Sequence, residues 1–571
     1  MNILGLSALG RDPAAALLVD GEIVAAIEET KLARTHTIED SPRAAVRICL
    51  ERGRIDWSGL EYVAVASRPV KKWIRQAIFR ARLAPLAPVS SAYYMNRALG
   101  ELGHNLNTLR VLRRMAGDSP HHIVELDHHL CHAASAYYAS PFDRAMIVVL
   151  DEQGDGRAGF VGMGEGSRIH EFKSISLPHS LAWVYSQITR LLGFSAHAEE
   201  HKTQWLSLSG EPVFRDLFLE VLRRDRGGPP HLDSKFFNRG FSGQLSFSED
   251  FYKRLQLPCQ DESRIEDALR ANIAASLQQA CAVVVREWLE VLGSETKANS
   301  LCLAGGLFMN PLLVAAVESN AGFDRVFVQP AAGNEGTALG AAWLVWHQGL
   351  NRPRVEPMSS LYWGPEYPNE VIKSVLDNCK LPYRYCNTED QQIDGTLRLL
   401  QAGKIVAWFQ GATEFGRRAL GHRSLLASPW APYVRENLND YVKHREAFRP
   451  FALSVPEDVC SEYFQCSMNG RFMTTMATAN DKGRRLLESL PEGFLLKDNL
   501  VRIHIVTADG NPLLYKLLKR SGENSPAPML VNTSFNLFGE PLVVTPRDAV
   551  RSYFCSGADA LLAGNFLLTK S

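Results

Sequence analysis

The sequence predicts a mixed α/β fold, on three observations. The chain has 571 residues, whereas single domains usually hold roughly 100–200, so two large units or several smaller ones are expected. Apolar strand-like runs at residues 145–150 and 300–303 alternate with long stretches of helical periodicity, as in α/β proteins. Hydrophobic residues make up 46% of the chain, which is enough for substantial cores.

The first predicted elements form a β-meander. Residues 2–7, 14–19 and 22–27 read as three strands, the last two joined by an Asp-Gly turn. Residues 71–115 mix Lys and Arg with Leu, Ile and Tyr, a composition that membrane-surface and RNA-binding helices share. We favour an amphipathic helix pair at the surface, because the chain as a whole has no excess of basic residues.

One helix is predicted clearly, between residues 265 and 288. Its apolar positions recur every three or four residues: Ile265, Leu269, Ile273, Leu277, Ala280, Val284 and Trp288. Such a helix packs one face against a sheet, so these side chains are core residues and not cofactor ligands. Residues 351–364 contain Pro, Arg and Ser without periodicity and form the predicted linker. The predicted domains are therefore 1–352 and 353–571.

The charge balance limits the choice of partners. The 62 basic residues equal the 62 acidic ones, so no global field attracts nucleic acid or an anionic membrane, and we expect neither as a partner. An anionic substrate must then meet a local cluster of cations. The ten cysteines lack the spacing of a disulfide framework or zinc site, and the start MNILGLSALG, followed by Arg11, is unlike a signal peptide. A cytoplasmic protein is expected.

The segment DHHLCHAASAYY carries the first candidate site. His128 and His132 are four residues apart, so on a helix both project from one face, as two imidazole ligands of one metal ion would. A histidine pair alone is more often structural. Here, however, Asp151 ends the apolar strand AMIVVL, where a carboxylate can reach the active edge of an α/β sheet. Three such ligands suit a divalent transition metal.

Three glycine-rich loops form the second candidate site. They are DEQGDG at 151–156, AGG at 304–306 and GNEGTALGAA at 333–342, the last of which leads into a helix. Glycine lets backbone N–H groups approach phosphate oxygens, and a helix N-terminus adds a favourable dipole. A single glycine loop is a weak signal, but three at strand ends of one domain indicate a nucleotide site.

The third candidate site lies in EFGRRALGHRS (414–424) and VKHREAFRPFA (442–452). It contains five cations: Arg418, Arg423, Lys443, Arg445 and Arg449. Arginine binds phosphate oxygens bidentately and lysine adds a point charge. Because these cations stand among Gly, Ala, Leu, Phe and Pro instead of acids, an anion pocket is favoured over a solvated face. VNTSFN (531–536) follows an apolar strand and offers hydroxyl and amide groups to the same ligand.

These motifs, with MNILGL, DGEIVAAIEE, LAGGLFMN and NLFGEP, resemble in order and over almost the whole chain the NodU/CmcH-type carbamoyltransferases of nodulation-factor, antibiotic and toxin biosynthesis. The resemblance implies an N-terminal domain of the actin/Hsp70-like (ASKHA) superfold and a C-terminal domain like threonylcarbamoyl-adenylate synthase (YrdC-like). In such enzymes carbamoyl phosphate and ATP, with Mg²⁺, give carbamoyl-adenylate and pyrophosphate in the C-terminal domain. The carbamoyl group then passes to a hydroxyl or amine of a small-molecule acceptor at an N-terminal metal site, usually iron.

The resemblance also assigns residues to roles. The metal ligands are His128, His132 and Asp151, with Asn334 where the family normally has Asp. The catalytic residues are Lys443, Arg418 and Arg449, with Arg11 and Asp12 at the acceptor end. The cofactor contacts are Gly305, Gly306, Asn310, Gly333, Gly336, Lys202, Arg423, Arg502, Asn532, Thr533, Ser534 and Asn536.

Several positions depart from the family pattern. Arg11 replaces a histidine that can take a proton from the acceptor, and arginine stays protonated, so another base or an amine acceptor is required. The candidate bases are His36, His197 and His201. Asn334 lacks the charge of Asp, which Glu335 or Glu152 would be able to restore. The remaining changes are Gln204 and Trp205 beside Glu200 and Lys202, and His504 in place of Gln.

Two other functions fit part of the sequence. A protein with this fold that has lost or altered the transfer chemistry would act as a partner subunit or use another acyl acceptor. A tRNA-modifying enzyme would need a basic face, which the charge balance disfavours. The sequence does not name the acceptor, and a homodimer is allowed as an assembly.

Overall fold

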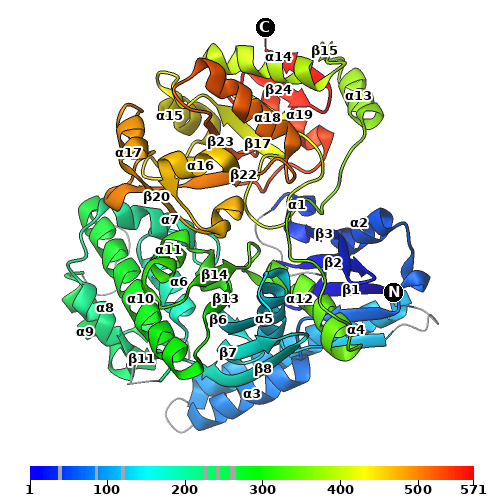
Figure 1. The fold of residues 1–571 in the computed structure, drawn as a ribbon. Coiled ribbons are helices and arrows are strands. Elements are labelled where there is room, and N and C mark those ends of the chain that lie inside the picture. Colours follow the sequence, from blue (N-terminus) through cyan, green and yellow to red (C-terminus); the bar gives the residue numbers. More distant parts are fainter. Residues whose placement is uncertain are drawn as a thin grey trace. The chain divides into compact units, whose positions relative to one another are not determined.

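The computed structural model divides the chain into two compact units (Figure 1). The first comprises Met1–Val24 and Glu39–Pro357, and the second comprises Ala25–Ile38 and Met358–Ser571. The structure describes residues 1–35, 41–83, 88–116, 122–223, 228–239, 245–257 and 265–570. The main boundary, between Pro357 and Met358, lies within 351–364, a segment without helix or strand. The second unit also contains a short N-terminal segment, which the sequence placed in the first domain.

The first unit contains two five-stranded sheets of the same design, except that the edge strand β3 (Glu22–Glu28) of the first sheet belongs to the second unit from Ala25 onward. The first sheet, in the order β3-β2-β1-β4-β5, consists of β1 (Asn2–Ser7), β2 (Ala14–Val19), β3 (Glu22–Glu28), β4 (Tyr62–Val65) and β5 (His122–Glu125). The second, in the order β8-β7-β6-β13-β14, consists of β6 (Arg144–Gly154), β7 (Arg157–Glu165), β8 (Arg168–Ser176), β13 (Ser300–Ala304) and β14 (Arg325–Val328). In each sheet an antiparallel meander continues into two parallel strands. This repeat of topology leaves no detectable repeat in the sequence.

Two helices of small residues lie between these sheets (Figure 1). Helix α5 (His128–Ala139) packs on β6 and β13 of the second sheet, and α12 (Thr337–Leu344) packs on β1 and β2 of the first. The helices also pack against each other, so closely that a Cβ on Gly340 would lie 1.8 Å from the carbonyl oxygen of Cys131. The Ala- and Gly-rich sequences of both helices thus allow the close four-layer packing that positions α5.

The other helices of the first unit cover these layers. Their bounds are α2 (Arg43–Gly53), α3 (Pro69–Leu83), α4 (Pro88–Ala116), α6 (Leu181–Leu191), α7 (Glu200–Leu206), α8 (Arg215–Val221), α9 (Glu249–Arg254), α10 (Asp267–Thr296) and α11 (Pro311–Asn320). Short two-stranded ribbons pair β9 (Leu222–Arg223) with β10 (His231–Leu232) and β11 (Phe237–Arg239) with β12 (Leu245–Phe247). Residues 71–83 and 88–115 fall on α3 and α4, which pack together as the predicted helix pair.

Helix α10 confirms five of the seven predicted core positions but not their packing partner: Leu269 is half-buried, and Ile265 is half-buried and precedes the helix. Ile273, Leu277 and Trp288 are fully buried. Their helix packs mainly against α7, α8 and α11 instead of a sheet. By length and composition α10 is the one helix among the described residues that could cross a membrane, but 61% of its apolar window is buried inside the protein, as in a core helix.

The second unit is built on an eight-stranded sheet. Its order is β15-β25-β24-β16-β17-β23-β18-β22, with β15 (Arg384–Tyr385), β16 (Val406–Phe409), β17 (Arg423–Ala427), β18 (Ala452–Pro456), β22 (Ile503–Val506), β23 (Leu530–Ser534), β24 (Ala560–Ala563) and β25 (Phe566–Thr569). Alternate residues of β16 enter two cores: Ala407 and Phe409 enter one, and Val406 and Trp408 enter the other. Both faces of the sheet are therefore covered.

Helices supply the outer side of each core. On one face lie α13 (Asn369–Asn378), α16 (Glu457–Tyr463) and α19 (Pro546–Phe554), and on the other α14 (Glu389–Gln401) and α18 (Pro512–Ser521). The unit also contains α1 (Glu29–Ala33), α15 (Val434–Glu436), α17 (Asp481–Glu488) and a small sheet of β19 (Phe464–Gln465), β20 (Ala477–Ala479) and β21 (Leu500–Val501). Both units are thus mixed α/β, as predicted.

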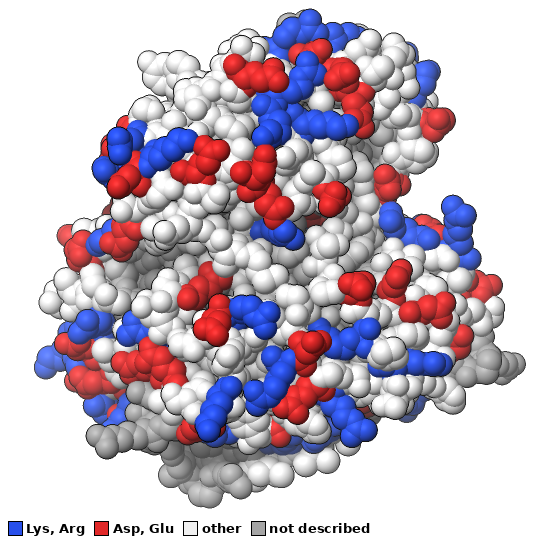
Figure 2. Space-filling model, viewed as in Figure 1, with Lys and Arg blue, Asp and Glu red and all other residues white. Residues whose placement is uncertain are grey.

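Charges of both signs are interspersed over the face shown in Figure 2, in keeping with the equal numbers of acids and bases. No basic stripe of the kind that follows a nucleic-acid backbone stands out on this face. A concentration of positive charge lies instead in a cluster of buried and half-buried cations of the second unit, described below.

Candidate metal and anion sites

Two histidines and one aspartate of the first unit meet at one point. Asp127 caps α5 by accepting a hydrogen bond from Leu130 N at 3.3 Å, so the helix begins at His128 and its period carries His132 to the same face. Asp151 lies near the end of β6. Its Oδ2 is 3.4 Å from His128 Nε2 and 3.9 Å from His132 Nε2, and the three ligand atoms lie within 4.8 Å of one another. The structure therefore brings the three predicted ligands together.

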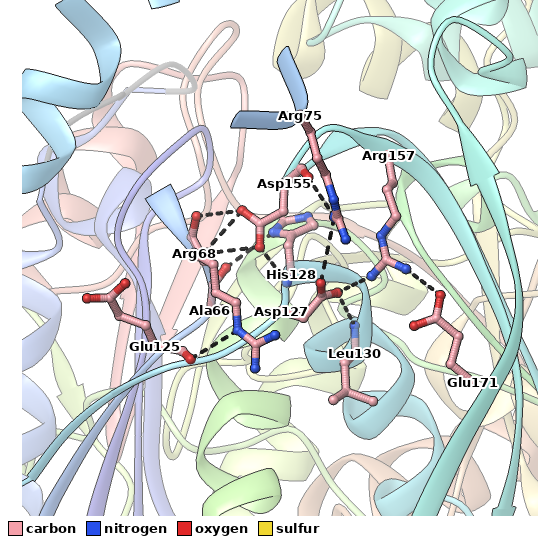
Figure 3. Close-up of polar contacts among 11 residues, drawn as sticks. Ala66, Arg68, Arg75, Glu125, Asp127, His128, Leu130, Asp155, Arg157 and Glu171 are labelled. Atoms are coloured by element: carbon pink, nitrogen blue, oxygen red, sulfur yellow. Dashed lines mark hydrogen bonds and ion pairs between the residues drawn. The ribbon is translucent and has the colours of Figure 1, made fainter. Parts of the chain in front are cut away.

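A buried carboxylate fixes the first of these histidines (Figure 3). Asp155 Oδ2 accepts from His128 N at 3.0 Å, while Oδ1 accepts from Ser67 Oγ at 2.8 Å. Arg68 N donates to the same carboxylate at 3.1 Å. On the imidazole, Nδ1 lies 3.4 Å from Ala66 O, which favours the tautomer with its proton on Nδ1 and a lone pair on Nε2. The ring nitrogen that faces Asp151 is then the one able to bind a metal.

The start of α5 is held by a second set of charges (Figure 3). Arg157 pairs with both Asp127 and Glu171, and Arg75 Nη1 lies 3.9 Å from Asp127 and donates to Asp155 O at 2.8 Å. Burial would raise the pKa of Asp127, but the charge of Arg157 keeps it below its usual value. The helix that carries both histidines is thereby anchored to β7, β8 and α3.

The donor set fits a divalent transition metal. Burial lowers the pKa of His132 to about 3, helped by the charge of His128, so its imidazole is neutral, which is the ligand form. Asn334 lies beside His132, and among the described residues neither its Oδ1 nor either ring nitrogen of His132 has a hydrogen-bond partner. Buried oxygen and nitrogen atoms without a hydrogen-bond partner are expected where a bound cation takes up their lone pairs. Two imidazoles and one carboxylate with further positions open suit Fe²⁺ and similar metals.

Two of the three glycine loops support these ligands directly. Gly306 N donates to Asp151 Oδ1 at 3.2 Å, and Gly305, at φ 95°, makes the turn after β13. A Cβ on Gly154 would lie 1.9 Å from the His128 ring. These glycines therefore allow the backbone to approach the candidate metal site.

The other predicted cofactor residues of this unit have protein partners. Asn310 caps α11 by accepting from the backbone N–H groups of Leu312 and Leu313, each at 3.1 Å. Lys202, which is buried, pairs with Glu199 at 2.7 Å. Gly333 and Gly336 flank Asn334; a Cβ on Gly336 would lie 2.0 Å from the carbonyl oxygen of Ala331, and one on Gly333 would lie 2.4 Å from Glu335 Oε2.

Arg11 and His197 contact the same carboxylate, that of Glu152. Glu152 Oε2 is 3.3 Å from Arg11 Nη1 and 2.7 Å from His197 Nδ1. Glu152 is thus engaged by these side chains, next in sequence to Asp151. Of the candidate bases, His197 is beside Arg11 through this acid, and His36 lies outside the described residues. Asp12 has φ 55°, a left-handed conformation in the turn between β1 and β2.

The second unit gathers five buried or half-buried cations: Arg418, Lys443, Arg445, Arg449 and Arg502. Burial, together with the charges of Arg417 and Arg449, lowers the pKa of Arg418 to about 10. Burial and the neighbouring arginines likewise hold the pKa of Lys443 and of Arg502 well below the usual range. Mutual repulsion of this kind is relieved when an anion binds between the cations. The cluster therefore has the electrostatics of a phosphate site.

The end of β23 and the residues that follow it lie beside Lys443. Lys443 Nζ donates to Ser534 O at 2.7 Å, to Ser534 Oγ at 3.1 Å and to Asn536 Oδ1. Ser534 Oγ also donates to Asn536 Oδ1 at 2.8 Å. Thr533 lies buried on the strand, and Asn532 Nδ2 donates to Ala419 O at 3.2 Å. The predicted hydroxyl and amide residues thus adjoin the cation cluster.

Arg423 holds the loop that carries Arg418. Its fully buried guanidinium donates to Gln410 O at 2.5 Å and to Gly411 O at 3.0 Å, and it stacks on Phe409 at 3.8 Å. The resemblance assigned Arg423 to cofactor binding, but its donors are directed at backbone carbonyl groups. It therefore differs in placement from the other cations.

His504 is buried in a polar row beside this loop. Its Nδ1 lies 2.9 Å from Ser454 Oγ and 3.2 Å from Asn532 Nδ2, and burial lowers its pKa to about 4. The folded protein thus keeps His504 neutral where the unfolded chain, with a pKa near 6.5, takes up a proton, so stability is lost as the pH falls from about 6.5 to about 4.

Between pH 6.5 and pH 4 the buried imidazole should lower the free energy of unfolding by about 3 kcal/mol, at about 1.36 kcal/mol for each of the 2.5 pH units. We expect His504→Gln, which has no group that titrates, to abolish this loss. Unfolding midpoints of the parent and the variant between pH 4 and 7 measure the difference. Exposed His444→Gln is the control. If the unfolding midpoints of the parent and His504→Gln fall equally with pH, the pKa of His504 is not lowered in the folded protein.

Sequence reasoning did not single out the supporting acids. Asp155 belongs to the DEQGDG motif and Asp127 directly precedes His128. The motifs could be recognised in the sequence, but the roles of these two acids could not. Glu414 accepts from the backbone N–H groups of Leu420, His422 and Arg423 at 2.9, 2.9 and 3.0 Å. A single carboxylate closing a loop leaves no signature in the sequence.

Both parts of the chain match known families. Residues 2–343 match the family model described as Carbamoyltransferase N-terminus, and residues 397–570 match the one described as Carbamoyltransferase C-terminus. The protein sll1178 of Synechocystis sp. is 32% identical, over 100% of this chain and 97% of its own. Nodulation protein NolNO of Sinorhizobium fredii is 29% identical, over 98% of this chain and 79% of its own.

A further relative and one solved structure share parts of the chain. The 3'-hydroxymethylcephem-O-carbamoyltransferase of Amycolatopsis lactamdurans is 29% identical over 43% of this chain and 44% of its own. The structure of full-length HypF in its phosphate- and nucleotide-bound form is 14% identical and covers 60% of this chain and 55% of its own, with a TM-score of 0.30.

Proposed function

Because the chain belongs to the carbamoyltransferase family, matched at residues 2–343 and 397–570, we propose that this transferase works in two steps at two sites. In the second unit, water attacks the phosphorus of carbamoyl phosphate, the bond from phosphorus to the carbamoyl oxygen breaks, and carbamate and inorganic phosphate form. A carbamate oxygen then attacks the α-phosphorus of ATP, the bond to the β-phosphate breaks, and carbamoyl-adenylate and pyrophosphate form. In the first unit the carbamoyl group passes to a hydroxyl or amine of a small-molecule acceptor and AMP leaves.

The observation that carries this proposal is the cluster of five cations, in which Lys443 is buried and the four arginines are half-buried. Carbamoyl phosphate and ATP are polyanions, and Arg418 and Arg449 offer forked donors to their phosphate oxygens, with Lys443 as a point charge. Ser534 and Asn536 share contacts with Lys443 and would orient it. In a water-poor pocket these fixed charges also stabilise the negative charge that develops at the α-phosphorus.

The first unit supplies the acceptor site of the proposal. His128, His132 and Asp151, with Asn334, would hold a divalent metal, proposed as Fe²⁺, which would polarise the carbamoyl carbonyl as a Lewis acid when bound. The repeated sheets with α5 and α12 between them support an ASKHA-type assignment for this unit. A YrdC-like second unit, a homodimer and a cytoplasmic location remain predictions.

The test is to incubate the protein with ATP, Mg²⁺ and carbamoyl phosphate and to measure pyrophosphate and carbamoyl-adenylate. We expect pyrophosphate release that depends on carbamoyl phosphate. Release of phosphate alone would refute the adenylate step. Pyrophosphate release without bound metal or transfer to any acceptor would favour the alternative, a family member with altered transfer chemistry.

Arg11 gives a prediction for the transfer step. Its fixed charge suits an anionic group on the acceptor or the adenylate, whereas His197, beside Glu152, is the better candidate base. We expect Arg11→Ala to weaken acceptor or nucleotide binding, and Arg11→His not to speed transfer to the native acceptor. Transfer rates against pH decide this: a faster Arg11→His with a new titration near neutral pH would identify residue 11 as the position of the base.

A further inference from the structure

The N-terminal segment Ala25–Ile38 belongs to the second unit although more than three hundred residues separate it from the rest of that unit. Ala26 N donates to Trp363 O at 3.1 Å, and the short helix α1 follows at once. Three side chains of this segment, Glu28, Lys31 and Arg34, contact the loops that carry the cation cluster.

Glu28 and Lys31 form a buried ion pair on the loop that leads to Arg418. Lys31 Nζ lies 3.0 Å from Glu28 Oε2, and both side chains are 5% exposed. The same ammonium donates to Glu414 O at 2.6 Å and to Gly416 O at 2.7 Å. Gly416 N in turn donates to Glu28 Oε1 at 2.6 Å. The pair therefore fixes both polar backbone groups of Gly416, two residues before Arg418.

The far end of that loop is closed by Glu414. Its Oε1 accepts from the backbone N–H groups of Leu420, His422 and Arg423, and it is completely buried. Gly416 itself has φ 95°, a left-handed conformation that turns the chain toward Arg418. Arg418 thus stands in a loop with one end held by Glu414 and the other by Glu28 and Lys31.

Arg34 holds the second loop of the cation cluster. Arg34 Nη2 pairs with Glu540 Oε2 at 2.7 Å, and Nη1 donates to Leu542 O. The backbone oxygen of Glu540 accepts from Asn536 Nδ2, whose Oδ1 accepts from Lys443. One short segment, from Glu28 to Arg34, therefore contacts the supports of both Arg418 and Lys443.

We propose that Glu28, Lys31 and Arg34 are positioning residues for the anion pocket, so that the adenylate-forming site is completed by a segment from the N-terminus of the chain. The proposal rests on the proposed function for its reaction. Its physical basis is that a phosphate clamp tolerates little displacement: an error of about 1 Å in a catalytic group can cost about 100-fold in rate.

The test separates positioning from stability by pairing two substitutions. Lys31→Met leaves Glu28 as an unpaired buried charge and will lower the unfolding midpoint, so its activity alone decides nothing. The double variant Glu28→Gln, Lys31→Met removes both charges and should restore the midpoint, yet it lacks the donors to Glu414 O and Gly416 O. We expect it to lose about 100-fold in kcat/KM for carbamoyl phosphate in pyrophosphate release.

Two measurements complete the design. Arg34→Met should also lower kcat/KM for carbamoyl phosphate, through the second loop, whereas Lys373→Met, which removes an exposed pair with Asp377, should change neither kinetics nor midpoint. A double variant with parental midpoint and parental kcat/KM would overturn the inference. A parent protein without pyrophosphate release would instead refute the proposed function, so the two failures are distinguishable.

Discussion

Replacing Lys443 by methionine should abolish the pyrophosphate release that depends on carbamoyl phosphate. Nζ of Lys443 is buried against Ser534 and Asn536, among the arginines of the cation cluster. Without this ammonium group, a bound phosphate dianion loses a positive charge that would neutralise it. Ser534 and Asn536 also lose the donor that they share. Two lost charge-assisted contacts amount to about 3–6 kcal/mol, or roughly 10²–10⁴ in kcat/KM.

Stability distinguishes this loss from unfolding. Burial and neighbouring cations already depress the pKa of Lys443, so an apolar residue of similar length relieves repulsion and should leave the unfolding midpoint equal or higher. Arg449→Met should show the same loss of activity. Lys404→Met, which breaks an exposed pair with Asp559 in the same unit, is the matched control. Parental turnover in both Lys443→Met and Arg449→Met would remove the cation cluster from the reaction.

Replacing Asp151 by asparagine should remove bound metal and acceptor transfer while pyrophosphate release persists. Asp151 is the one carboxylate of the donor set, and its Oδ2 faces both histidines. Substituting a residue that merely supports a metal ligand lowers metal affinity about 10–100-fold, and substituting a direct ligand should lower it at least as much. Metal analysis of the purified protein and titration with Fe²⁺ measure the effect independently of activity.

The reverse change should strengthen binding at the same site. Asn334→Asp adds a negative charge beside His132, so we expect tighter metal binding than in the parent. Asp143→Asn, at an exposed position just before β6, is the control for loss of a carboxylate in this region. If neither the parent nor Asn334→Asp holds metal while transfer proceeds, the donor set has no role in transfer.

Local patterns explain how much of the site could be predicted. The spacing of His128 and His132 sufficed because helix period is a local property, and the turn residues after β6 and β13 are visible as glycines. The clustering of cations was likewise readable because Arg418, Lys443 and Arg449 lie within one short stretch of chain. Packing partners that are distant in the sequence could not be predicted in this way. Helix α10 was predicted to pack against a sheet, but it packs mainly on other helices.

By itself the sequence determined the α/β class and the carbamoyltransferase family, and it proposed the residue types of both candidate sites, since each depends on short-range periodicity or contiguous motifs. Only the tertiary structure decided which acids orient these residues. Asp155 reaches His128 across 27 positions, and Lys31 reaches Glu414 across 383. A contact of that separation is set by how strands and loops pack, and a lone buried Lys or Asp has no local pattern that reveals its partner.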